Sequence, residues 1–361
     1  MATTKKNSAP KKKQKPLTQM TNPRKKSAGK NGSFHVICVG ASAGGLNAIG
    51  ELLAQLQPGL HAAVFVVFHL SRSSLGDIFL QRLKKTTALP CSIPTSNEKI
   101  QPDHVYLAAP DSHLLLQKDR VIIGHGPSEN RFRPSIDVLF RSAAAHYGNR
   151  AIGVVLTGLL NDGTAGMWAI KQSGGHCIVQ DPNEAEYPDM PLSVLENMEV
   201  DHCGSLKTMG QAIENIIHDS EPKNLVPPAI VTAESAISEK VASGIEVVSQ
   251  LGEKSVYACP ACGGGLWKID NGKLSHYRCH IGHSYSDQDL VLEQAEGVEQ
   301  TLWVALRMME ERKLFMLKLA NENSNKGLER LNQSYRQQGK QLEIHIDKLK
   351  DLLFEIHKER T

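Results

Sequence analysis

Several features that define large protein classes are absent from this 361-residue sequence. No apolar run approaches the ~20 residues that a membrane-spanning helix needs. The N-terminus lacks the apolar core of a secretory signal. The seven cysteines are an odd number in a long chain, which does not resemble a disulfide framework. We therefore expect a cytoplasmic protein that does not insert into membranes.

Acidic side chains are missing from residues 1–30, which hold nine lysines and Arg24. This segment also contains three prolines and few apolar residues, a composition typical of disorder. We predict a disordered basic tail over residues 1–33, solvated and without a specific nucleic-acid partner. The rest of the chain has 31 basic and 38 acidic side chains, so the net charge of the whole chain says little about the folded part.

Apolar runs alternate with helical patterns from residue 34 to about 219. The runs at 35–39, 64–68, 151–156 and 176–180 resemble buried parallel strands, which are apolar on both faces. Three short runs within 105–124 indicate an inserted antiparallel hairpin or meander. We predict an α/β domain with a doubly wound, mostly parallel sheet and a β-hairpin insertion.

The remainder of the chain divides into three parts. Prolines at 222, 227 and 228 interrupt the pattern, so we predict a linker over 220–250. A Cys/His-rich, zinc-ribbon-like module is expected over 251–286. Apolar stripes over 287–361 predict two C-terminal helices that pair as a hairpin or as a coiled coil with a second copy or a partner protein.

The sequence Gly40-Ala41-Ser42-Ala43-Gly44-Gly45 directly follows the first apolar run. A strand that ends in Gly-x-Ser-x-Gly can turn sharply into a helix and expose the serine hydroxyl. The glycines leave room for the turn and for a substrate to reach backbone N–H donors. We interpret Ser42 as a candidate nucleophile. A loop that cradles a nucleotide phosphate and a turn without chemistry are the alternatives.

Two residues with matching chemistry occupy equivalent positions. His69 follows the 64–68 run, and Asp162 follows the 151–156 run. A serine nucleophile needs a base and an orienting carboxylate, and the carboxyl ends of parallel strands meet at one sheet edge. The positions therefore predict a triad of Ser42, His69 and Asp162.

Two other enzyme classes fit parts of the pattern. An ordinary α/β-hydrolase would use the order Ser, Asp, His, with His176 or His202 following Asp162. A dinucleotide-binding enzyme is disfavoured because the glycines at 40, 44 and 45 lack the Gly-x-Gly-x-x-Gly spacing.

The stretches 39–45, 69–70, 134–144 and 155–167 resemble the CheB-type protein-glutamate methylesterases of bacterial chemotaxis. The resemblance covers about half of the chain and supports the same triad. It implies that Ser42 attacks γ-glutamyl methyl esters on methylated chemoreceptor cytoplasmic domains and releases methanol, with no cofactor for catalysis. It also implies that backbone N–H groups near Ala43 and Leu159 form the oxyanion hole.

The chain departs from that family in two respects. Members of the family often carry Thr where this chain has Ala43, and Met-Gly where it has Leu159-Leu160. Well-known members also carry a receiver domain before the esterase, whereas only a basic tail precedes Ser42 here, so we expect no phosphorylation control of that kind in cis. A catalytically idle scaffold that binds receptors or signalling partners is the alternative function.

Two cysteine clusters in the C-terminal half have zinc-ligand spacing. Cys259-x2-Cys262 is separated by 16 residues from Cys279-His280-x2-His283. We predict a structural zinc ion held by Cys259, Cys262, Cys279 and His283, with His280 as the alternative fourth ligand. A redox-active Cys-x2-Cys pair is the competing interpretation. The module resembles the zinc-ribbon-type appendage of some stand-alone methylesterase-like proteins.

Overall fold

The structure is a computed structural model. It describes residues 34–69, 76–220, 225–240, 244–272 and 274–358. The basic tail that we predict over residues 1–33 lies outside the described residues.

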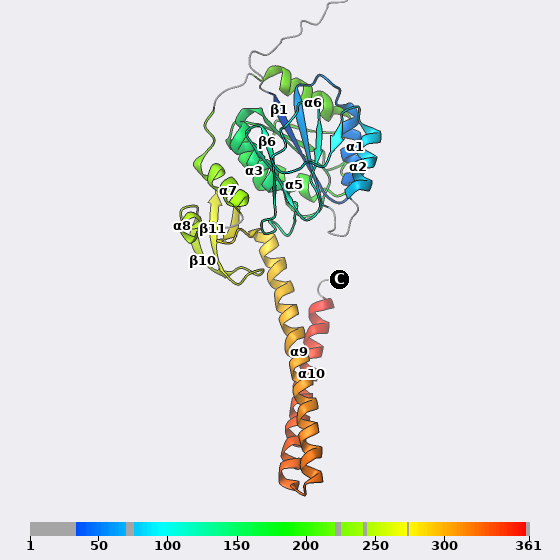
Figure 1. The fold of residues 1–361 in the computed structure, drawn as a ribbon, viewed down its shortest axis with the longest axis vertical. Helices are drawn as coiled ribbons and strands as arrows, with labels where there is room; N and C mark the ends of the chain where they lie inside the picture. The colour runs from blue at the N-terminus through cyan, green and yellow to red at the C-terminus, as the bar shows by residue number, and fades with distance from the viewer. Residues whose placement is uncertain (1–33, 70–75, 221–224, 241–243, 273, 359–361) are drawn as a thin grey trace, which may run out of the picture. The chain divides into compact units, whose positions relative to one another are not determined.

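Seven parallel strands form the main sheet in the order β3-β4-β2-β1-β7-β8-β9. Figure 1 shows β1 among the helices that cover this sheet. The strands are β1 (His35–Ala41), β2 (Ala62–Phe68), β3 (Cys91–Ser92), β4 (Val105–Leu107), β7 (Ala151–Val155), β8 (His176–Gln180) and β9 (His202–Gly204). The central strand β1 pairs with β2 on one side and with β7 on the other. Its side chains are buried on both faces, which is why the residues that follow His35 are apolar or glycine.

Helices cover both faces of this sheet. One face packs against α1 (Gly45–Gln55), α2 (Gly76–Thr86) and α6 (Leu206–Asp219). The other packs against α3 (Ile136–Tyr147), α4 (Thr164–Gln172), α5 (Asp189–Asn197) and the hairpin of β5 (His113–Gln117) and β6 (Arg120–Gly124). The short 3-10 turn η1 (Gly148–Arg150) joins α3 to β7. The predicted doubly wound α/β domain is confirmed.

Two expectations, one for this domain and one for the segment that follows it, need correction. The first of the three short runs expected to form a meander, β4, belongs instead to the parallel sheet, because it pairs with β2. Residues 220–250, predicted as a linker, contain α7 (Ala229–Lys240) and α8 (Ile245–Ser249). Helix α7 buries Glu234 and Ser235, so it is a packed element of the fold.

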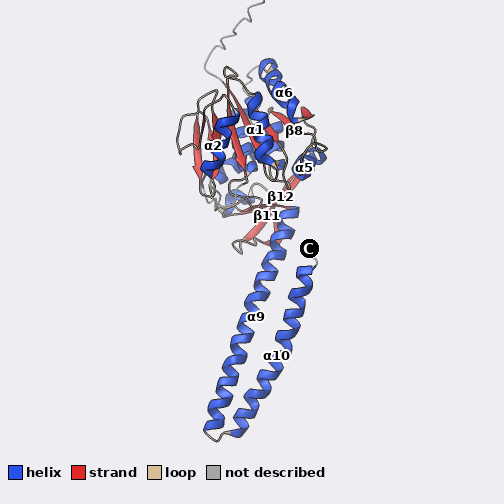
Figure 2. Cartoon of the chain, turned by 90° about the vertical axis from the view of Figure 1, so that its right-hand side faces the viewer, coloured by secondary structure: helices blue, strands red, loops and turns tan. Residues whose placement is uncertain are grey.

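A second, antiparallel sheet and two long helices follow. The sheet consists of β10 (Glu253–Ala258), β11 (Gly265–Asn271), β12 (Leu274–Cys279) and β13 (Ser284–Ser286). Helices α9 (Asp287–Asn325) and α10 (Glu329–Lys358) lie side by side as a hairpin (Figure 2). Leu306, Ile346 and Leu353 are buried between them.

Two general findings concern the described residues. None of the described helices is both long enough and apolar enough to cross a membrane. All seven cysteines are free thiols, and Cys203 is exposed.

Replacing Phe140 tests the packing of α3 on the sheet. Its side chain is fully buried, so Phe140→Ala removes apolar burial and leaves a cavity. We expect a loss of ~3–5 kcal/mol in the free energy of unfolding, measured by urea denaturation. Ile78→Ala is the control, because Ile78 on α2 of the same domain is 64% exposed, and its effect should stay within ~0.5 kcal/mol. Equal losses in the two variants would contradict this packing.

Candidate active site and metal centre

Ser42 lies at the sharp turn between β1 and α1. Gly44 has a φ of +73°, in the left-handed region that glycine adopts without strain. A Cβ at Gly44 would also lie 2.8 Å from the Glu186 carboxylate. Gly45 then begins α1, and its N–H donates to the Ser42 carbonyl over 2.9 Å. This turn places the serine at the carboxyl edge of the sheet.

The structure brings Ser42, His69 and Asp162 together. His69 follows β2 and Asp162 lies between β7 and α4, so they flank β1 from its two neighbouring strands. His69 Nδ1 lies 3.2 Å from Ser42 Oγ, and His69 Nε2 lies 2.9 Å from Asp162 Oδ2. An ionised carboxylate can only accept, so it holds the imidazole proton on Nε2. Nδ1 is then left to accept the serine proton.

The histidines of the alternative Ser-Asp-His order lie elsewhere. His176 begins β8, at the opposite end of the strand from the carboxyl edge, and pairs with the Ser220 hydroxyl at 2.9 Å. His202 begins β9, the edge strand that is third from β1. The sheet geometry therefore rules out this alternative.

The Asp162 carboxylate is buried at the N-terminus of α3. It accepts from the backbone N–H groups of Ile136 (2.7 Å) and Asp137 (3.2 Å) and from the Ser135 hydroxyl (2.9 Å). Burial alone would raise the pKa of Asp162, but the hydrogen bonds from His69 and Ile136 lower it below its ordinary value. The helix N-terminus thus keeps the carboxylate charged.

Asn130 connects Asp162 to a second buried carboxyl group, Asp137. Its Nδ2 group donates to Asp162 Oδ1 (3.0 Å) and to Asp137 Oδ2 (2.6 Å). Burial, and then the charge of Asp162, raise the pKa of Asp137 to about 8. The two neighbouring carboxyl groups therefore hold different charges at neutral pH, with Asp162 ionised and Asp137 mostly protonated.

Phe132 covers one face of the His69 ring. The two rings are stacked, with centroids 3.6 Å apart and an interplanar angle of 7°, which restricts rotation of the imidazole. No sequence pattern assigned a role to Phe132 or Asn130. The only available signal was that they immediately precede the 134–144 stretch that resembles the methylesterases.

Backbone donors are available beside Ser42. Among the described residues, no partner engages the N–H groups of Ala43 and Leu159. The loop after β7 is tied to the serine by a hydrogen bond from Ser42 N–H to the Thr157 carbonyl (3.0 Å). A Cβ at Gly158 would lie 2.8 Å from Ser42 Cβ, so only glycine permits this approach. The oxyanion role of Ala43 and Leu159 stays a prediction.

A cavity of about 450 Å³ lies close to this site but not at the serine. Its lining includes Asn130, Asp137, Leu160 and Ser284, and it does not include Ser42 or His69. The cavity is therefore not lined by the Ser42 hydroxyl or the His69 ring.

Comparison with known proteins identifies the domain that carries this site. The sequence profile described as CheB methylesterase matches residues 37–213. A Leptospira interrogans protein, provisionally named protein-glutamate methylesterase/protein-glutamine glutaminase, is 37% identical over 180 residues, which are 50% of this chain and 93% of that protein. The chain belongs to the CheB methylesterase family.

A second relative and one solved structure are also similar to this chain. A Photorhabdus laumondii protein-glutamate methylesterase/protein-glutamine glutaminase is 36% identical over 183 residues, which are 50% of this chain and 52% of that protein. The crystal structure of the Thermotoga maritima CheB methylesterase catalytic domain is 27% identical, with a TM-score of 0.49, and covers 51% of this chain and 99% of that chain.

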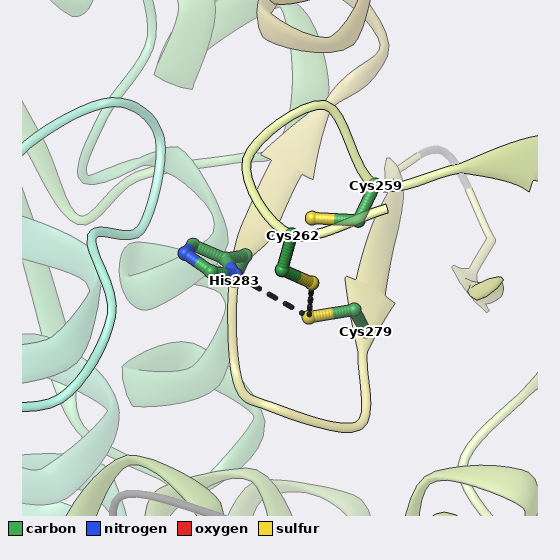
Figure 3. A group of neighbouring side chains, drawn as sticks. All are labelled: Cys259, Cys262, Cys279 and His283. Carbon is green, nitrogen blue, oxygen red and sulfur yellow. Dashed lines mark hydrogen bonds between the residues drawn. The ribbon is translucent and has the colours of Figure 1, made fainter. Parts of the chain in front are cut away.

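Outside the CheB methylesterase region, four metal-ligand side chains gather in the antiparallel sheet (Figure 3). The ligand atoms of Cys259, Cys262, Cys279 and His283 lie within 4.8 Å of one another. Cys262 Sγ lies 3.8 Å from Cys279 Sγ, which lies 3.5 Å from His283 Nδ1. Tetrahedral zinc places two thiolates about 3.8 Å apart and a thiolate and an imidazole about 3.5 Å apart. The donor set therefore fits zinc, with His283 as the fourth member.

Contacts within and around the cluster favour one thiolate, at Cys259. The hydrogen bond with Cys279 lowers the pKa of Cys259 to about 3, although burial opposes this shift, and the same hydrogen bond raises the pKa of Cys279. The Tyr285 hydroxyl lies 3.3 Å from Cys259 Sγ. A thiolate is the form that binds metal ions, and hydrogen bonds from outside the ligand set orient it.

The raised pKa of Asp137 predicts a pH-dependent stability. The unfolded chain releases this proton near pH 4, whereas the folded protein retains it up to about pH 8. The folded state binds more protons between these values, so the contribution of Asp137 to the free energy of unfolding falls as the pH rises.

We expect the unfolding free energy of the wild type, minus that of Asp137→Asn, to decrease from about pH 4 to pH 8. Urea denaturation at a series of pH values measures it. Asp351→Asn, at an exposed position, is the control. A difference that stays constant across this range would contradict the raised pKa.

Proposed function

We propose that this chain is a serine esterase that removes methyl groups from glutamate γ-methyl esters on methylated chemoreceptor cytoplasmic domains. The observation that carries the proposal is the continuous chain of hydrogen bonds from Ser42 through His69 to Asp162. It lies within the region that matches the CheB methylesterase family, and the names of the relatives supply the substrate class.

The proposed reaction has two stages. Ser42 Oγ attacks the ester carbonyl carbon while its proton passes to His69 Nδ1, and the N–H groups of Ala43 and Leu159 donate to the oxyanion. The carbon–oxygen bond to the methoxy group then breaks, and His69 protonates the departing group to give methanol. Water attacks the acyl-enzyme, transfers a proton to His69 and restores the serine, which leaves a free glutamate. Asp162 stays ionised and stabilises the imidazolium.

The same stages apply to a glutamine side chain, with ammonia leaving in place of methanol. The names of the relatives include this glutaminase activity. We therefore propose glutamine deamidation as a second reaction of the same site.

We propose a structural zinc ion at Cys259, Cys262, Cys279 and His283. Protein side chains supply all four ligands, so the ion would stabilise the antiparallel sheet. The esterase steps use only protein groups, and we propose no cofactor for catalysis.

We further propose a cytoplasmic location, because the proposed substrate is the cytoplasmic part of a receptor. The helical hairpin exposes Trp303, Phe315 and Phe354 by 53–67%. These side chains support the proposal that α9 and α10 also bind a second copy or a partner protein.

Replacing the nucleophile tests the esterase. Ser42→Ala should lower methanol release from methylated receptor cytoplasmic domains by at least about a thousandfold, because no other group forms the acyl-enzyme. Circular dichroism should show an unchanged fold, and Ser334→Ala, at an exposed position on α10, should keep wild-type activity. A folded wild type that binds receptor and releases neither methanol nor ammonia would favour the scaffold alternative.

Replacing one thiol tests the metal site. The native protein should contain about one zinc ion per chain, and Cys262→Ser should lose it because three ligands hold zinc far less tightly than four. Elemental analysis of the purified chains measures the zinc content. Cys203→Ser, which changes an exposed thiol outside the cluster, should retain the metal. Native protein that binds no zinc would refute the assignment.

A further inference from the structure

A tight turn over residues 129–132 lies between the candidate active site and the C-terminal module, which we define as residues 253–296. Glu129 and Phe132 exchange two backbone hydrogen bonds of 3.2 and 3.0 Å that close the turn. Toward the active site, Phe132 stacks on His69 and Asn130 donates to Asp162. Toward the C-terminal module, the 129–132 turn receives contacts at three successive residues.

The first of these contacts is a buried pair of charges. The Arg278 guanidinium of β12 donates to both Glu129 carboxylate oxygens, at 3.0 and 2.7 Å. Arg278 is fully buried and Glu129 is 2% exposed. A bidentate pair of this kind fixes direction as well as distance.

The next two contacts follow along the turn. Asn130 N–H donates to the Ser284 carbonyl of β13 over 2.9 Å. The Arg131 guanidinium donates to Glu293 of α9 over 3.0 Å and also pairs with Glu296. The C-terminal module also contacts the loop that carries Asp162, because Asn161 Nδ2 donates to Ser286 Oγ over 2.9 Å.

The backbone of the turn needs such support. Asn130 and Arg131 have backbone φ values of +50° and +71°, in a region that residues other than glycine rarely adopt. Such conformations cost free energy and persist where surrounding contacts determine them. The contacts from Arg278, Ser284 and Glu293 hold the backbone of the turn in this conformation.

We propose that the C-terminal module positions His69 and Asp162 for catalysis, with Arg278 and Glu293 as positioning residues that act through the 129–132 turn. For its catalytic readout this inference rests on the proposed esterase function. The module thereby makes the geometry of the triad depend on a part of the chain outside the CheB methylesterase region.

Charge reversal at the partly exposed pair tests the proposal. Glu293→Lys combined with Glu296→Lys repels Arg131 and should lower kcat for methanol release by about tenfold or more, with KM little changed, because the imidazole is misplaced. Adding Arg131→Glu to that double variant restores opposite charges and should restore kcat. Glu311→Lys, an exposed change on the same helix, is the control. Arg278→Gln removes the bidentate contact with Glu129 and should lower kcat further. Circular dichroism checks that this variant folds.

A second readout does not need a receptor. We expect the proton between His69 Nε2 and Asp162 to give a far-downfield signal in the proton NMR spectrum, which its loss in His69→Gln would assign. The double charge reversal should shift or broaden this signal, and Arg131→Glu should restore it.

The outcomes separate the two proposals. Unchanged kcat and an unchanged signal, or losses that Arg131→Glu does not rescue, overturn the positioning role. If the wild type shows no Ser42-dependent methanol release, the proposed esterase fails. The rescue of the downfield signal then decides the positioning role by itself.

Discussion

A single buried carboxylate, Glu129, joins three elements of the described fold. It accepts hydrogen bonds from Arg141 of α3, Arg278 of β12 and Ser238 of α7. Burial alone would raise the pKa of Glu129, but the charges of Arg141 and Arg278 hold it well below its usual range. Loss of one member of a buried ion pair costs ~3–5 kcal/mol, because the remaining charge has no counterion. Charge pairing at Glu129 therefore specifies how α3, α7 and β12 pack against one another.

The same requirement explains why the stretch expected to be a linker is packed. Glu234 of α7 accepts from His276 of β12 over 2.8 Å and lies 3.3 Å from Arg278 Nε. Burial opposes ionisation, but His276 and the nearby arginines lower the pKa of Glu234 to about 2. The helix is fixed by buried apolar side chains, Val231 and Ile237, and by polar contacts from residues more than 40 positions away. A search for apolar stripes detects only the first of these, because a buried glutamate gives no apolar signal.

The positions of the candidate active-site side chains were predictable for a local reason. Strands that are buried on both faces appear as continuous apolar runs, so the residues that follow them, such as His69, can be placed at the carboxyl edge from the sequence. Asn130 and Phe132 have no comparable signal. Their positions depend on left-handed backbone at 130 and 131 and on contacts with β12, β13 and α9, which only the folded chain brings together.

The loop between β7 and α4 contains a strained residue, Leu160, next to residues that are held by contacts distant in the sequence. Its φ is +66°, at the position where the resemblance places a glycine, and a non-glycine residue in this region costs of order 1–3 kcal/mol. The adjoining residue, Asn161, is held by Ser286, and the next residue, Asp162, by the N-terminus of α3. The strained residue thus precedes two anchored ones, one of them anchored by the C-terminal module. The contacts that fix the loop beside Leu160 therefore come both from α3 and from residues outside the CheB methylesterase region.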